Sequence, residues 1–458
     1  MKNRQCTNRW GRRRAVPDRS LLVTPLLLAT GAIPMLGVVA ETRARDYVFS
    51  PIVKSGDANP SQAVNFTNVN LGGVDASSGA AFIGTFTVNA TTYSGLYRAQ
   101  NGAITTIADR GTPGPAGETI NSIIASGDYE NGVVVFAANT TAGRTLYRYT
   151  PGQGLTALVH QGDVLPGSSA GVSTFYNRGV AGDASEFAFG TALESGNTAV
   201  FTSAGGTPMR MVDDKTRSPI AETGYFVDFP EISYRNGITA FVGRAADPDW
   251  PGPGPAPVEP SGVFIANPGN PLTIVAGRNQ EIPGGDGLRF REFERPRVMP
   301  DGRVGFAGGF IDEDDPDNGE RHMGVFIRNA DLTWKNYIDS EMDLPGLHAP
   351  TEEFNQYSVE TGVNYFGVND EDGGSYIYYE SAEGVFTRLI DTYSPLDGKA
   401  LSSIRMLADT AIGEQLFFRA NFTDGTTGIY TVFVPEPGMA SVLSLAAISV
   451  GALRRRRK

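Results

Sequence analysis

The sequence predicts an all-β fold, a seven-bladed β-propeller with four-stranded blades, from three observations. A turn that ends in proline recurs seven times, apolar strand segments recur in phase with it, and no sustained helical period occurs between the two termini. Repeats of four short strands over about 50–60 residues are typical of propeller blades, which bury both faces against their neighbours. An elongated β-solenoid or a string of sandwiches is the competing interpretation.

The recurring turn sets the length of the repeat. Its first four prolines, Pro60, Pro113, Pro166 and Pro219, are each separated by 53 residues. The next three spacings are 64, 62 and 50 residues, which accommodate insertions. Each turn ends a predicted outer strand; these strand-and-turn segments are 52–60, 107–113, 159–166, 212–219, 275–283, 338–345 and 390–395.

Three further strands are predicted in every unit. The innermost strands lie around Phe66, Ile120, Phe175, Phe229, Phe293, Phe354 and Ile404. The second strands centre on Phe82, Phe136, Phe189, Phe241, Phe306, Phe366 and Phe418, and three of them follow Asn-Gly or Asp-Gly hairpin dipeptides. The third strands contain Tyr97, Tyr147, Phe201, Phe264, Phe326, Tyr378 and Tyr430.

The strand order at the two ends of the repeat predicts how the ring closes. The chain enters with an isolated fourth strand at 47–54 and leaves after a third strand at 428–433. The N-terminal strand is therefore expected to complete the last blade and to remove an exposed edge. An open array would not need this additional strand. We predict one propeller domain over residues 46–433.

The C-terminal segment 434–458 combines three features in order. A Pro-Glu-Pro turn precedes an apolar run at 439–453 and a final basic cluster. Fifteen apolar residues rise about 22 Å as a helix, short of a hydrocarbon core of about 30 Å, which suits transient inner-membrane anchoring. The basic cluster is expected on the cytoplasmic side. An amphipathic helix docked on the domain is the alternative.

This segment resembles the PEP-CTERM signal of bacterial surface proteins. The resemblance covers residues 434–458, while the body is similar to propeller regions of such exported proteins only in pattern. It implies an exosortase-type processing enzyme as a partner. The residues that carry the sorting signal are Pro435, Glu436, Pro437, Arg454, Arg455, Arg456 and Arg457.

The N-terminus reads as a signal peptide over residues 1–40. Seven basic residues precede an apolar stretch at 21–39, and Val38-Val39-Ala40 offers a small-x-small cleavage site. The arginine pairs fit a twin-arginine signal poorly, so general secretion is preferred, and an uncleaved anchor is the alternative. Together the two termini predict an exported protein, first a membrane-anchored precursor and then located at the cell surface or outside the cell.

Composition limits the partners of the mature protein. The only cysteine, Cys6, lies in the predicted signal peptide, so the body has no disulfide and no thiol metal site. The net charge of −12 becomes −23 for residues 41–438 once +6 from the first 40 residues and +5 from the last 20 are set apart. Such an acidic body repels nucleic acid and anionic membrane. Cations, basic proteins and glycans remain as partners.

Two acidic loops suggest a calcium site. They follow corresponding strands of adjacent blades, and clustered carboxylates are suitable ligands for a hard cation. The candidate ligands are Asp312, Asp314, Asp315, Asp370 and Asp372. Neither loop has the regular Asp-x-Asp-x-Asp-Gly spacing, so solvated hairpin tips are the alternative. No other cofactor is predicted.

The sequence contains none of the common catalytic motifs. His160, His322 and His348 are scattered along the chain, and no nucleophile elbow, phosphate loop or His-Glu-x-x-His occurs. Trp250, on a Pro/Gly-rich insertion, either contacts a ligand or packs against its own blade. Polar residues expected to point into the central channel are Tyr176, Asn177, Arg178, Arg289 and Arg291.

These observations favour a protein that is not an enzyme. The main prediction is an exported surface or matrix propeller, used for adhesion or for binding a glycan or a surface protein. The alternative is an exported hydrolase or lyase with its site in the central channel. A pocket at the channel that gathers a carboxylate and basic partners would favour the enzyme.

Overall fold

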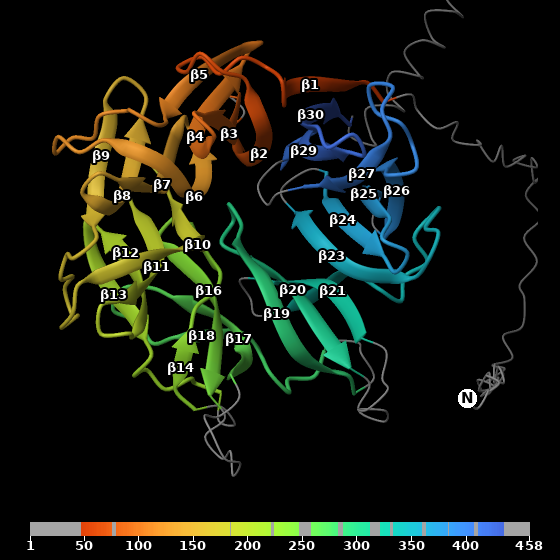
Figure 1. Ribbon diagram of the computed structural model, residues 1–458. Helices are drawn as coiled ribbons and strands as arrows, with labels where there is room; N and C mark the ends of the chain where they lie inside the picture. The colour runs from red at the N-terminus through yellow and green to blue at the C-terminus, as the bar shows by residue number, and fades with distance from the viewer. Residues whose placement is uncertain are drawn as a thin grey trace, which may run out of the picture. The chain divides into compact units, whose positions relative to one another are not determined.

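The computed structural model describes residues 47–75, 79–183, 185–220, 224–246, 258–282, 287–311, 321–329, 333–359, 363–382, 384–406 and 411–434. The chain divides into two units, 1–46 and 47–458, and all the described residues belong to the second. They form seven antiparallel sheets that surround a central axis (Figure 1). The predicted seven-bladed propeller is confirmed. The predicted signal helix and sorting helix lie outside the described residues.

Each blade runs from an innermost strand beside the axis to an outermost strand at the rim. The innermost strands are β2 (Phe66–Asp75), β6 (Ile120–Glu130), β10 (Val172–Gly182), β14 (Phe226–Asp228) with β15 (Ile232–Arg235), β19 (Arg289–Val298), β23 (Thr351–Ser358), and β27 (Leu401–Arg405) with β28 (Ala411–Ile412). The second strands are β3 (Gly79–Val88), β7 (Val133–Thr140), β11 (Phe187–Leu193), β16 (Ile238–Ala246), β20 (Val304–Ile311), β24 (Tyr365–Asp370) and β29 (Gln415–Phe422).

The third and outermost strands complete the blades. The third strands are β4 (Thr91–Gln100), β8 (Gly143–Thr150), β12 (Thr198–Ala204), β17 (Val258–Ala266), β21 (Arg321–Arg328), β25 (Ser375–Ala382) and β30 (Thr427–Phe433). The outermost strands are β5 (Ala103–Ala108), β9 (Gly154–His160), β13 (Thr207–Asp213), β18 (Thr273–Gly277), β22 (Trp334–Asp339), β26 (Val385–Asp391) and β1 (Phe49–Lys54). Among the described residues no helix is long and apolar enough to cross a membrane.

A cross-strand aromatic pair stabilises every blade. The phenylalanine at the centre of each second strand lies directly opposite a tyrosine or phenylalanine of the third strand, as Phe136 lies opposite Tyr147. These two ring centroids are 5.6 Å apart, and both side chains are fully buried. Cross-strand aromatic pairs contribute packing energy beyond their buried area. The aromatic markers of the repeat are therefore its structural centres.

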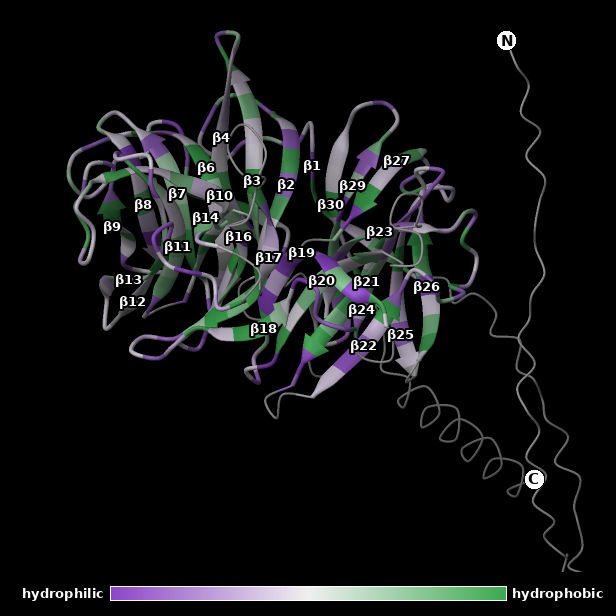
Figure 2. Ribbon diagram, turned by 90° about the horizontal axis from the view of Figure 1, so that it is seen from below, coloured by the Kyte–Doolittle hydropathy of each residue, from purple (hydrophilic) through white to green (hydrophobic). Residues whose placement is uncertain are grey.

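The apolar core lies between the blades. Seven clusters of buried side chains each combine residues of two neighbouring blades, including one cluster that joins the last blade to the first. Hydrophobic segments follow the strands, whereas hydrophilic segments are frequent in the loops (Figure 2). No blade buries both of its faces alone, so the ring is the unit that folds.

The N-terminal strand closes the ring as predicted. Strand β1 pairs antiparallel with β30, in a register that joins Phe49 to Val432 and Lys54 to Gly428. Val53 of β1 is buried in the cluster that the last and first blades share. The closure covers the edge that β30 would otherwise expose.

The fourth unit departs from the predicted strand pattern. Phe229 was expected inside an innermost strand, but it lies in the break between β14 and β15. Both short strands pair with β16, so together they take the place of the innermost strand of this blade. Pro230 follows Phe229, and a proline has no N–H to donate to the sheet ladder, which accounts for a break at this point.

Candidate functional site

All seven innermost strands are irregular. The register of five of them shifts within the strand, between Leu71 and Gly73, Ser126 and Tyr129, Phe175 and Val180, Glu294 and Arg297, and Phe354 and Gln356. The other two are divided into β14 with β15 and β27 with β28. A bulge or break leaves residues outside the ladder and redirects their side chains. The irregularities therefore place side chains and backbone groups near the axis outside the hydrogen-bond ladder of the sheet.

A cavity of about 360 Å³ lies where these irregularities meet. Gly72, Gly127, Glu231, Arg295 and Gln356 all line it, and each lies at an interruption of its strand. Small-molecule sites usually occupy a few hundred cubic ångströms and place a few polar groups in a mostly apolar surface. The cavity has the size of such a site.

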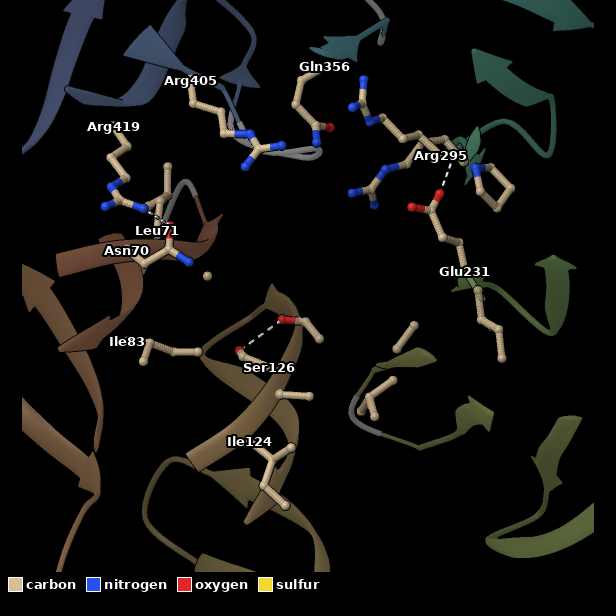
Figure 3. Close-up of a pocket in the computed structure, with 18 residues that line it drawn as sticks. Asn70, Leu71, Ile83, Ile124, Ser126, Glu231, Arg295, Gln356, Arg405 and Arg419 are labelled. Atoms are coloured by element: carbon tan, nitrogen blue, oxygen red, sulfur yellow. Dashed lines mark hydrogen bonds between the residues drawn. The ribbon is translucent and has the colours of Figure 1, made fainter. Parts of the chain in front are cut away.

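The cavity has two chemically different walls (Figure 3). One wall carries the polar side chains of β19, β23, β27 and β29, namely Arg295, Arg297, Gln356, Arg405 and Arg419. The other wall carries apolar side chains of β3, β6 and β10, namely Ile83, Ile124, Ala125, Val180 and Ala181. Four guanidinium groups gather here although the body of the protein is strongly acidic. The cavity therefore favours a ligand with a negative charge and an apolar face.

Arg295 connects several residues of the polar wall through its side chain and its backbone. Its side chain is 7% exposed, and its guanidinium lies 2.6 Å from Glu353 Oε1 and donates to the carbonyl of Phe354. Its backbone N–H donates to Glu231, and its carbonyl accepts a hydrogen bond of 2.7 Å from the Tyr357 hydroxyl. The backbone at Arg295 has φ of 54°, an uncommon conformation for this residue type that these contacts maintain.

Arg419 has a different environment. Its guanidinium donates to the amide oxygens of Asn70 at 3.2 Å and Asn68 at 3.1 Å, while its Nε is buried without a hydrogen-bond partner. Burial lowers the pKa of Arg419, and the positive charge of Arg405 lowers it further. Arg419 forms no ion pair with any residue that the structure describes. Within the described part of the chain, its guanidinium is bound by the neutral amide groups of Asn68 and Asn70.

Glu231 supplies a carboxylate at the cavity. It follows Pro230 in the break between β14 and β15, and one oxygen accepts the backbone N–H of Arg295. Among the described lining residues, Glu231 is the one with an acidic side chain. A carboxylate at a partly enclosed site can exchange protons with a bound molecule, as general acid or base catalysis requires.

The predicted channel residues are only partly in the right place. Arg289 and Arg291 lie on β19, at least four residues before the part of that strand that lines the cavity. Both side chains contact Asn279. Tyr176 lies on β10 outside the lining; burial raises its pKa, and the charge of Asp228 raises it further. Asn177 and Arg178 belong to the same strand, but their side chains lie outside the described part of the molecule.

The principal cavity residues were missed from the sequence. They are Glu231, Arg295, Arg297, Gln356, Arg405 and Arg419. Two of them have a local signal, because Pro230-Glu231 and Arg295-Pro296 place a proline where a regular innermost strand would be expected. Arg405 and Arg419 have no such signal, because their approach to the cavity depends on the closed ring.

The calcium prediction remains a prediction. Asp312, Asp314 and Asp315 lie outside the described residues, and Asp372 is exposed at a turn. Asp370 is buried and accepts hydrogen bonds of 2.6 Å from both the Gly374 N–H and the Tyr376 hydroxyl. In the described ranges no three His, Cys, Asp or Glu side chains gather as a metal site would require.

The other residues singled out from the sequence lie apart from the cavity. His160 lies 3.5 Å from Asp163, His322 stacks on Phe310, and His348 packs against Tyr393. None of the three lines the cavity. Trp250 falls outside the described residues.

Fold and cavity define a class, a seven-bladed β-propeller with an arginine-rich site at its axis. Residues 74–372, more than half of the chain, match the model of a family described as a family of unknown function, DUF7453. The chain belongs to this family. No curated protein matches it.

Solved structures with a similar fold are distant in sequence. The polysaccharide lyase Uly1 is 11% identical with a TM-score of 0.44, and the match covers 78% of this chain and 88% of that one. An ulvan lyase of family PL25, bound to -[GlcA(1-4)Rha3S]-, is 10% identical with a TM-score of 0.43, covering 85% and 96%. A GH74 enzyme from Niastella koreensis is 14% identical with a TM-score of 0.43, covering 84% and 53%.

These matches contradict the prediction that the protein is not an enzyme. Polysaccharide lyases and glycoside hydrolases recur among the matching structures, so the non-catalytic interpretation is withdrawn. At this level of identity the likeness shows the fold alone. Evidence for the activity of this chain therefore comes from its own cavity.

Proposed function

We propose that the protein is a polysaccharide-cleaving enzyme, a hydrolase or lyase whose active site is the central cavity. The observation that carries the proposal is the conjunction of a carboxylate, Glu231, with four guanidinium groups in a cavity of about 360 Å³. The cavity is large enough for a sugar unit, and its position on the axis lets the rest of a chain extend along either face of the ring.

The side chains have distinct roles in this proposal. Glu231 exchanges a proton with the substrate, because it is the acidic side chain among the described lining residues. Arg295, tied to Glu353 and Glu231, is a positioning residue that keeps the carboxylate in place. The apolar wall excludes water and contacts the C–H face of a sugar ring.

The number of carboxylates that line the cavity favours a lyase over a hydrolase. Glycoside hydrolysis generally needs two carboxyl groups on either side of the scissile bond, whereas elimination needs one base. Glu353, the other nearby carboxylate, is bound to Arg295 and does not line the cavity. The single carboxylate among the described lining residues, Glu231, is therefore enough for elimination, whereas hydrolysis would need a second one.

Export and sorting complete the proposal. The signal peptide at 1–40 and the PEP-CTERM-like segment at 434–458 support release of the folded ring at the cell surface, where polysaccharides are accessible. An exosortase-type enzyme would process the chain within the segment 434–458. The ring is closed by β1 before this segment begins.

The test is a polysaccharide panel incubated with the full chain. Elimination would be followed by the ultraviolet absorbance of the unsaturated product, and hydrolysis by new reducing ends without that absorbance. The Glu231→Gln variant is expected to lose activity by about 100-fold or more, since general acid–base groups contribute that much. Arg148→Gln, on β8 outside the cavity, is the control. Full activity of the Glu231→Gln variant would contradict the assignment.

A further inference from the structure

We infer that the cavity binds an acidic glycan, and that Arg405 and Arg419 hold its carboxylate or sulfate group. The inference rests on the proposed function for the location of the glycan and adds its chemical class. It is carried by the charge environment of Arg419 and by the two unlike walls of the cavity.

Arg419 brings a partly buried positive charge to the cavity. Removing a charge from water is costly unless an opposite charge or several hydrogen bonds compensate it. Arg419 donates to two neutral acceptors, Asn68 and Asn70, and the positive charge of Arg405 lies near it. A bound anion would relieve this repulsion and provide an acceptor for the buried Nε.

Residues of a neighbouring blade orient Arg419. It lies on β29 of the last blade, whereas Asn68 and Asn70 lie on β2 of the first blade. Asn68 also accepts a hydrogen bond of 3.1 Å from the Thr427 hydroxyl of β30, which is the strand that β1 covers. Ring closure thus holds the guanidinium in one position before a ligand arrives, and such preorganisation reduces the entropic cost of binding.

The charge around the cavity differs in sign from the charge of the body of the protein. The body of the protein carries −23 over residues 41–438, so a polyanion is repelled by most of the surface. Arg295, Arg297, Arg405 and Arg419 reverse that sign locally. An acidic ligand is therefore recognised at this cavity and not by the general field of the protein.

The apolar wall of the cavity favours a ligand with an apolar face. Ile83 and Ile124 form an apolar surface that faces the arginine wall (Figure 3), and Val180 also lines the cavity. A sugar with an acidic substituent has a charged edge and an apolar C–H face, and it satisfies both walls at once. A neutral sugar would bring no anion to Arg419.

An acidic substrate with a carboxylate next to the reacting carbon also fits elimination. The base, Glu231, would take the proton from the carbon beside the carboxylate, the electron pair would form a carbon–carbon double bond, and the bond to the neighbouring sugar oxygen would break. Protonated Glu231 then gives a proton to that leaving oxygen, which regenerates the carboxylate, so no water, oxidant or reductant is consumed. Positive charge at the carboxylate stabilises the anion that develops in this step.

The test is calorimetric binding to the full chain of three oligosaccharides of equal length. One carries uronate carboxylates, one carries sulfate esters without uronate, and one is neutral. We expect one or both acidic probes to bind more tightly than the neutral probe. Arg419→Gln and Arg405→Gln should each weaken that binding by about 10- to 100-fold, the range for a hydrogen bond to a charged group. Arg148→Gln removes the same charge from β8 and should bind as the wild type.

The outcomes separate the inference from the proposed function. Arg405 is exposed, so its variant is expected to fold even if the Arg419 variant does not. Equal affinity for neutral and acidic probes, or wild-type affinity in a folded Arg405→Gln variant and a folded Arg419→Gln variant, would overturn the inference. Tight binding of an acidic probe that the wild type never cleaves would reject the enzyme and leave the inference standing. Cleavage of neutral polysaccharide alone would do the reverse.

Discussion

The second and third strands of each blade differ sharply from the innermost strand. The pairing between the second and third strands is almost continuous, and an aromatic pair lies at its centre in all seven blades. The innermost strands instead shift register or divide in every blade, and their interruptions line the cavity.

This difference indicates that the regular part of each blade and the lining of the proposed site lie on different strands of the same sheet. The regular strands bury aromatic side chains between the blades, which is the main favourable term in folding. The innermost strands give up ladder hydrogen bonds and present Glu231, Arg295 and Gln356 at the axis instead. Substitutions in the two regions should therefore have separable effects.

The largest effect is expected from Phe136→Ala in β7. Phe136 is fully buried and pairs with Tyr147, so its removal leaves a cavity and should cost about 3–5 kcal/mol of unfolding free energy. Urea denaturation would measure the loss. Arg405→Gln, at the axis and exposed, should stay within about 0.5 kcal/mol of the wild type. Equal losses in the two variants would contradict the separation of stability from function.

A smaller effect is expected where a regular strand meets an innermost one. A methyl group added at Gly84 of β3 would lie 2.5 and 2.6 Å from two ring carbons of Phe66, the first residue of β2. Gly84→Ala should therefore cost about 1–3 kcal/mol through overpacking. In a Phe66→Leu background, which removes those ring carbons, the cost should be smaller; an unchanged cost in this double-mutant cycle would refute the clash.

The smallest effect is expected at Asp214, in the connection from outer strand β13 to innermost strand β14. Burial raises the pKa of this carboxyl, and the charge of Asp213 raises it further. The folded state therefore binds the proton more tightly than the unfolded state, and stability falls as pH rises through the raised pKa. Asp214→Asn removes this fall.

Melting curves at several pH values would measure the Asp214 effect. Asp214→Asn should melt above the wild type near neutral pH, and the difference should shrink as the pH is lowered and the wild-type carboxyl becomes protonated. Asp372→Asn, at an exposed turn, is the matched control. A difference that grows on acidification would show that the sign is wrong.

Much of the blade architecture could be predicted because it repeats in the sequence. Phe82, Tyr97 and their counterparts mark the second and third strands, and their spacing places them in register within each unit. The closure of the ring could be predicted from β1, because an additional strand at the start of the repeats matches a missing strand in the last blade. The strand at Phe229 was misplaced because Pro230 ends the ladder there.

The site could not be predicted in the same way. Arg295, Arg405 and Arg419 belong to three different strands and do not recur at equivalent positions of the other blades. Nothing near Arg405 and Arg419 in the sequence distinguishes them from Arg289 or Arg291, which contact Asn279 and do not line the cavity. Only Pro230 and Pro296 gave local evidence of an interruption.

Local sequence was sufficient for the blade, because alternating apolar residues, paired aromatics and turn residues act over a few positions and recur seven times. The meeting of Arg419 with Asn68 and Asn70 required the closed ring, since these residues are about 350 positions apart and become neighbours only when the last blade packs on the first. The charge of the cavity is thus a property of ring closure, whereas the number and shape of the blades follow from the repeat.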